Sequence, residues 1–175
     1  MFTDPEQNIN HLHLREGYQV ADLGAGIGAY SFAAARKIGK SGKVYAVEVQ
    51  KDLVSKIRNG ALGAKLENVE VLWGDVEEKG GSKIADNVVD AVIISNILFQ
   101  TEDKDGLLAE TNRILKSGGK ILVVEWSESF SGLGPQPEHV VQKAKAKHLF
   151  GGAGFALEEE FDAGEHHYGF VFTKV

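Results

Sequence analysis

The chain has 175 residues, of which 43% are hydrophobic and 25% charged, a size and balance that suit one domain with a sizeable core. A net charge of −6 argues against a large basic surface for nucleic acid, and no apolar stretch reaches the roughly 18 residues of a membrane span. The complete lack of cysteine excludes disulfides, cysteine-ligated zinc and a thiolate nucleophile. The first residues show no signal or transit pattern, so a cytoplasmic protein is expected.

Apolar runs alternate with amphipathic segments along the chain. The pattern predicts strands and helices in the order strand 18–23, helix 31–39, strand 43–49, helix 51–61, strand 68–75, strand 86–95, helix 105–116, strand 120–126 and helix 139–150. Ser31 is the expected N-cap of the first helix, and the segment 129–137 is a Gly/Pro-rich loop. Strands at 155–161 and 167–175 then follow one another directly, which predicts an antiparallel hairpin.

Strands that alternate with helices indicate an α/β fold with a doubly wound, Rossmann-like sheet and right-handed crossovers. The terminal hairpin departs from the usual dinucleotide-binding arrangement. We expect a single domain over 1–175, with 1–17 as a short lead-in. Ligands of such sheets bind beyond the carboxyl ends of the strands.

The stretch VADLGAGIGAY at 20–30 carries three glycines on alternate positions between the first strand and the first helix. One glycine would suffice for a bend, so three suggest that a ligand lies against the turn, where backbone without Cβ atoms allows close approach. Two kinds of ligand fit. The first is a nicotinamide or flavin cofactor, such as the NAD(P) of an oxidoreductase, since G-x-G-x-x-A is matched with Ala29 in last place and Glu48 follows twenty residues after Gly28.

The second kind is a nucleoside that carries a positive charge and no phosphate. Asp22 would repel a pyrophosphate but attract a cationic amino-acid end. Glu48, at the end of the second strand, would bridge a cis-diol through its two carboxylate oxygens. Asp75 would bind an adenine amino group, with the Val76 backbone N–H beside it. Three acids at the ends of three successive strands suit S-adenosylmethionine.

Five motifs in order resemble class I S-adenosylmethionine-dependent methyltransferases, closest to the group related to ubiquinone/menaquinone-biosynthesis C-methyltransferases. They are DLGAGIG, VYAVEV, GDVE, DAVIISN and RILKSGGKILVVEW, and the resemblance covers essentially the whole chain. It implies a seven-stranded sheet whose last strand is antiparallel, and S-adenosyl-L-methionine as the cofactor.

Carried over residue by residue, the resemblance implies a methionine and ribose pocket, an adenine pocket and a contact at the end of the fourth strand. The residues are Asp22, Gly24, Ala25, Gly26, Gly28, Glu48, Val49, Asp75, Val76 and Asn96. Each has a structural alternative. Gly24 and Gly28 could serve helix–strand packing, Asp22 could cap the turn, Glu48 could be a solvated strand end, Asp75 a turn residue and Asn96 a helix N-cap.

Methyl transfer from a sulfonium is an in-line displacement, so positioning dominates, and a general base is needed only for a weakly nucleophilic acceptor. The sequence therefore marks no catalytic residue and no metal ligands. The N-P-P-[YF] motif of amino methylation is absent, and cytosine C5 and arsenite methylation use cysteines. A small, planar or apolar acceptor is expected, and candidate residues for contact with it are Tyr30, Phe99, Gln100, Trp126 and His167.

Two further points stay open in the sequence. The pair His166 and His167 could supply a base or a metal ligand, although an exposed strand terminus is favoured for it. The short lead-in predicts either an open acceptor site or one that a second subunit or partner closes, such as a homodimer would provide. A non-catalytic cofactor-binding domain of the same fold is a third hypothesis for the function.

Overall fold

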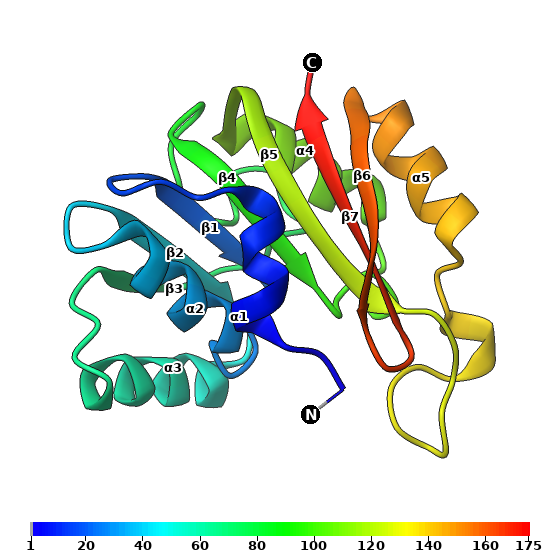
Figure 1. Cartoon of the computed structure of the whole chain (residues 1–175), viewed down its shortest axis with the longest axis horizontal. Helices are drawn as coiled ribbons and strands as arrows, with labels where there is room; N and C mark the ends of the chain where they lie inside the picture. The colour runs from blue at the N-terminus through cyan, green and yellow to red at the C-terminus, as the bar shows by residue number, and fades with distance from the viewer. Residues whose placement is uncertain (1) are drawn as a thin grey trace.

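Residues 2–175, the part of the chain that the computed structural model describes, form one mixed sheet of seven strands in the order β3-β2-β1-β4-β5-β7-β6 (Figure 1). The strands are β1 (Gln19–Leu23), β2 (Lys43–Glu48), β3 (Val69–Trp73), β4 (Val89–Ser95), β5 (Leu115–Trp126), β6 (Phe155–Gly164) and β7 (His167–Lys174). Strands β1 to β5 are parallel, and β7 runs antiparallel to both β5 and β6. The predicted sheet and its terminal hairpin are confirmed.

Helices cover both faces of the sheet (Figure 1). They are α1 (Pro5–Asn8), α2 (Ala29–Ile38), α3 (Lys51–Gly63), α4 (Lys104–Ile114) and α5 (Lys143–Gly152), with short 3-10 turns at Ile9–Leu12 and Pro137–His139. The Ile9–Leu12 turn and α2 share one apolar cluster with one face of the sheet, and α4 and α5 share the other. Buried alanines in α2, Ala33 to Ala35, let this helix lie close to the strands.

Two local predictions are wrong. Helix α2 begins at Ala29, so Ser31 lies inside it and is not the N-cap; its hydroxyl instead donates to Asp22. Strand β5 begins at Leu115, five residues before its predicted start at 120, and it carries an irregularity, with Gly118 at φ 73°. Within 2–175, no helix combines the length and apolar character that crossing a membrane would require.

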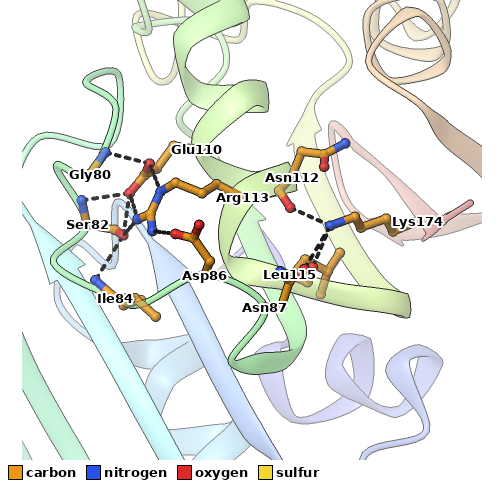
Figure 2. Close-up of polar contacts among 10 residues, drawn as sticks. All are labelled: Gly80, Ser82, Ile84, Asp86, Asn87, Glu110, Asn112, Arg113, Leu115 and Lys174. Atoms are coloured by element: carbon orange, nitrogen blue, oxygen red, sulfur yellow. Dashed lines mark hydrogen bonds and ion pairs between the residues drawn. The ribbon is translucent and has the colours of Figure 1, made fainter.

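The connection from β3 to β4 has no helix, and an ion-pair network fixes it to α4 (Figure 2). The Glu110 side chain is fully buried and accepts hydrogen bonds from the backbone N–H groups of Gly80 (2.8 Å) and Ser82 (3.1 Å). Arg113 binds both carboxylate oxygens of Glu110, at 2.6 and 2.8 Å, and also Asp86 at 2.6 Å. Because every oxygen of Glu110 has partners, the buried charge is tolerated and the connection is held in place.

Burial by itself would raise the pKa of Glu110, but the hydrogen bonds from Arg113, Ser82 and the backbone outweigh it and lower the pKa to about 2. Lys174 of β7 lies close by in Figure 2 and donates to the carbonyls of Asn112 and Leu115, both at 2.7 Å. A cation there satisfies carbonyls at the carboxyl end of α4 and complements the helix dipole.

We predict that Glu110→Gln lowers the free energy of unfolding at pH 7 by about 3 kcal/mol, because it leaves the largely buried Arg113 with only the exposed Asp86 as a charge partner. Since the pKa of Glu110 is depressed on folding, its contribution is complete above about pH 4.5 and is lost as the pH falls toward 2. The wild type should therefore lose more stability than Glu110→Gln between pH 5 and pH 2.5. Urea unfolding at both pH values measures this, with the exposed Glu102→Gln as control; equal losses in all three proteins would contradict it.

Candidate functional site

A hollow of about 460 Å³ lies at the carboxyl ends of β1 to β4. It brings together all but one of the ten residues predicted to bind the cofactor, from Asp22 on β1 to Asn96 after β4. The exception, Gly28, is buried just behind the turn. The volume of the hollow is that of an ordinary site for a small molecule or cofactor. The convergence of four strand ends at one sheet edge is what places residues from 22 to 96 around one space.

The three glycines of the turn all have positive φ, but they face different surroundings. A Cβ on Gly28 (φ 86°) would lie 2.9 Å from Phe32, and one on Gly24 (φ 73°) would lie 2.6 Å from Ile97. Gly26 (φ 58°) has no atom within 4 Å of that position. Close packing therefore explains Gly24 and Gly28, as the structural alternative held, whereas Gly26 leaves its space open to the hollow.

Asp22 lies at the end of β1, with 2% of its surface exposed. Its carboxylate accepts a 2.6 Å hydrogen bond from the Ser31 hydroxyl on α2. Burial raises the pKa of Asp22 to about 6; the Ser31 hydrogen bonds oppose this shift, and the nearby Glu48 adds to it. The ionised carboxylate is therefore costly here, and a cationic ligand in the hollow would stabilise it.

Glu48 is buried and joins the glycine turn to the start of α3. Its Oε2 accepts from the Gly26 N–H at 2.9 Å, and its Oε1 accepts from the N–H groups of Val49 and Gln50, each at 2.9 Å. Of the four lone pairs of a carboxylate, one on Oε2 is left. In this arrangement Oε2 can accept from one hydroxyl, and the contact of both oxygens with a diol stays a prediction. Glu48 is also not a solvated strand end.

The other side of the hollow is apolar at its rim. Ile27 and Val49 are 64% and 54% exposed, although each is a large hydrophobic residue on the lining. Val76 lies on the same lining, next to Asp75, whose Oδ1 caps the turn by accepting from the Glu77 N–H at 2.9 Å. Exposed apolar side chains beside a hollow indicate the place of a flat, apolar part of a ligand.

Asn96 follows β4 with a left-handed backbone (φ 56°), and it caps no helix because turns follow it. Its Oδ1 is buried with no hydrogen-bond partner, while its backbone oxygen accepts from Gln100 at 3.2 Å. A buried polar atom without a partner is costly unless a bound molecule satisfies it. Its place on the lining of the hollow fits a ligand that donates a hydrogen bond.

The residues predicted for the acceptor divide into two groups. Tyr30 and Gln100 line the hollow. Phe99 packs against the core on the α4 face, while Trp126 and His167 pair across β5 and β7 and do not line it. His167 is buried, so the exposed strand terminus expected for this residue is wrong.

Sequence reasoning missed Glu125, which holds the loop after β4. Its Oε2 accepts from the Leu98 N–H and its Oε1 from the Trp126 N–H, both at 2.8 Å. Burial raises the pKa of this fully buried carboxyl to about 7. A charged residue inside the apolar run ILVVEW was the available signal, because a buried acid needs partners.

Comparison with known proteins agrees with this geometry. Residues 14–168 match the family described as "Methyltransferase domain". The ubiquinone/menaquinone biosynthesis C-methyltransferase UbiE of Haemophilus ducreyi is 33% identical over 120 residues, which are 66% of this chain and 44% of that protein. An arsenite methyltransferase of Halobacterium salinarum is 32% identical over 107 residues, 61% of this chain and 27% of that protein.

A crystal structure of a SAM-dependent methyltransferase from Aquifex aeolicus superposes with a TM-score of 0.89 at 27% identity, covering 99% of this chain and 91% of that one. The chain thus spans less than half the length of the two curated relatives above, but nearly the whole of this solved structure. The matches confirm the predicted class of protein and, for the family, the predicted cofactor S-adenosylmethionine. They favour it over NAD(P).

Alanine substitutions at these glycines distinguish a glycine that close packing requires from one that leaves space for a ligand. We predict that Gly28→Ala lowers the free energy of unfolding by more than 2 kcal/mol, because it combines a left-handed backbone with a clash against Phe32. Gly26→Ala adds only the backbone cost of about 1 kcal/mol, since its Cβ meets open space. Thermal and urea unfolding of the two variants compare them directly. An equal loss in both would contradict the distinction.

Proposed function

The chain belongs to the methyltransferase domain family, and we propose that it transfers a methyl group from S-adenosylmethionine to a small-molecule acceptor. The observation that carries this proposal is the convergence of Asp22, Glu48 and Asn96 on the lining of one hollow. A cation, a hydroxyl-bearing sugar and hydrogen-bond donors are features of this one cofactor, and each finds a counterpart here.

Different residues of the hollow would bind different parts of the cofactor. Asp22 would face the positively charged amino-acid end, and the open backbone at Gly26 would admit the ligand to the turn. Glu48 would accept one ribose hydroxyl on Oε2. Val49 and Val76 would pack on the adenine faces, with Asp75 at its amino edge, and Asn96 Oδ1 would accept from a donor of the ligand.

When bound, S-adenosylmethionine supplies a methyl carbon that the positive sulfur already activates. The task of this chain is then to orient the acceptor and to exclude water. The Asn96–Gln100 segment forms the side of the hollow nearest β5, and Glu125 fixes its backbone through the Leu98 N–H. This fixed segment would hold the acceptor side of the site in one geometry.

The acceptor class follows from chemistry rather than from any one relative. A planar or apolar small molecule is consistent with the aromatic residues at this sheet edge, and quinone-related rings are the class that the name of the Haemophilus relative suggests. Arsenite is disfavoured, because the chain has no cysteine to hold it. A cytoplasmic location and a homodimer stay predictions.

We predict that S-adenosylhomocysteine binds and that Glu48→Ala weakens its affinity at least tenfold, about 1.4 kcal/mol. The variant loses both a hydroxyl acceptor and the bond that shapes the turn at Gly26. Isothermal titration calorimetry measures the affinities, with the exposed Glu67→Ala as the matched control. The proposed function would fail if the folded wild type bound no S-adenosylhomocysteine.

A second prediction concerns the release of protons when the ligand binds. Because the pKa of Asp22 is raised to about 6, this carboxyl is about half protonated at pH 6. A bound cation stabilises its ionised form and lowers the pKa, so binding should release about half a proton at pH 6 and almost none at pH 8. Titration of S-adenosylhomocysteine in buffers of different ionisation enthalpy counts the protons. The release should vanish in Asp22→Asn and persist in the exposed Asp52→Asn.

A further inference from the structure

Two segments of the cofactor hollow would hold the adenine ring, and Trp73 lies between them. The first segment is Val49, which follows β2, and the second is the pair Asp75 and Val76, which follows β3. Trp73 is the last residue of β3, the edge strand of the sheet, and it pairs in register with Glu48 of β2. Its backbone leads directly into the second segment. The question is what its side chain does for the first.

The Trp73 side chain reaches back to the end of β2. Its indole Nε1–H donates to the Val49 carbonyl oxygen at 2.8 Å. The N–H of the same Val49 donates to Glu48 Oε1 at 2.9 Å, so both backbone polar groups of this residue have partners. The N–H of Gly74, next along the chain, donates to the Glu48 carbonyl oxygen at 3.2 Å. Two hydrogen bonds thus connect the end of β3 to Glu48 and Val49.

A cation lies against the ring of Trp73. Lys51 Nζ is 4.8 Å from the ring centroid, a distance at which cation–π attraction is effective. Lys51 is the first residue of α3, and the amino end of a helix is an unfavourable place for a positive charge. The negative face of the indole ring offsets that cost. Trp73 is 55% exposed, so packing alone restrains it weakly, and these polar contacts help to orient its ring.

We propose that Trp73 is a positioning residue for the cofactor, which sets the width of the adenine slot between Val49 and the Asp75–Val76 pair; this rests on the proposed function. Trp73 does not line the hollow, so it would act through Val49 and not by touching the ligand. The Val49 side chain is 54% exposed at the rim, and its backbone is what holds it there. A flat ring gains dispersion energy from both walls only when both lie at contact distance.

The first test removes the indole N–H and keeps an aromatic ring. Trp73→Phe should weaken the binding of S-adenosylhomocysteine about fivefold, the size of one neutral hydrogen bond. Lys51→Met is the matched control, because it removes the cation and leaves the bond from Trp73 to the Val49 carbonyl; its affinity should equal that of the wild type. Isothermal titration calorimetry measures all three proteins. Wild-type affinity in Trp73→Phe overturns the proposal.

A double-mutant cycle separates positioning from a general structural effect of the same side chain. Val49→Ala removes the methyl groups that would pack on adenine but keeps the carbonyl that Trp73 binds. If Trp73 acts through the Val49 side chain, Trp73→Phe should weaken binding much less in the Val49→Ala background than in the wild type. Equal fold-losses in the two backgrounds overturn the proposal.

A fluorescence readout keeps Trp73 in place and so does not depend on the folding of Trp73→Phe. The chain has two tryptophans, and Trp126→Phe leaves Trp73 as the only one. Because its indole is bonded to a residue of the hollow, its emission should change as S-adenosylhomocysteine binds, with the dissociation constant that calorimetry gives. Constant emission while calorimetry shows saturation overturns the proposal. Failure of the folded wild type to bind S-adenosylhomocysteine overturns the proposed function instead.

Discussion

The carboxylate of Glu48 is the contact on which the rest of the site depends. It ends β2, yet it binds the backbone of the glycine turn that follows β1 and the first N–H groups of the segment that opens α3. One buried side chain therefore fixes two strand–helix connections relative to each other. Charge-assisted bonds to amides are strong and directional, so the hollow has a defined shape before a ligand arrives.

The same kind of contact, a buried carboxylate bound to backbone N–H groups of a loop, recurs around the edge of the sheet. Glu110 binds the backbone of the β3–β4 connection, and Glu125 binds the backbone of the loop after β4. Each acid is buried, and each holds a segment that contributes a wall of the site. Loops are usually the mobile parts of an α/β fold. Here backbone amides in the connections after β1, β3 and β4 bind carboxylates on other elements, which gives loop residues such as Val76 and Asn96 fixed positions.

Two hollows that share Thr3 lie next to each other at this edge of the sheet. Asp22, Glu48 and the open backbone at Gly26 lie in the first, on the side of β1 to β4, and Phe2, Phe161 and the His166–His167 pair lie in the second, on the side of β5 to β7. The antiparallel hairpin is what supplies the second set of residues at the same sheet edge, since β7 begins where β5 ends.

The sequence by itself determined the sheet, its terminal hairpin and the acids at the strand ends. Hydrophobic periodicity and glycine placement are local signals, and parallel strands bring their carboxyl ends to one edge in every fold of this class. It also marked Gly26, although it could not separate the glycine that admits a ligand from the two that pack. That distinction depends on Phe32 and Ile97, and Ile97 lies some seventy residues away in the chain.

Only the tertiary structure decided which polar atoms remain available for further hydrogen bonds. Ser31 was predicted to cap a helix and instead binds Asp22, and Glu48 has one lone pair left because three amides occupy the others. His167 lines a separate hollow from Tyr30, which no spacing along the chain reveals. Hydrogen-bond satisfaction is a property of all neighbours in space, so the unpartnered atoms of Asn96 and His167 become visible only after the chain has folded.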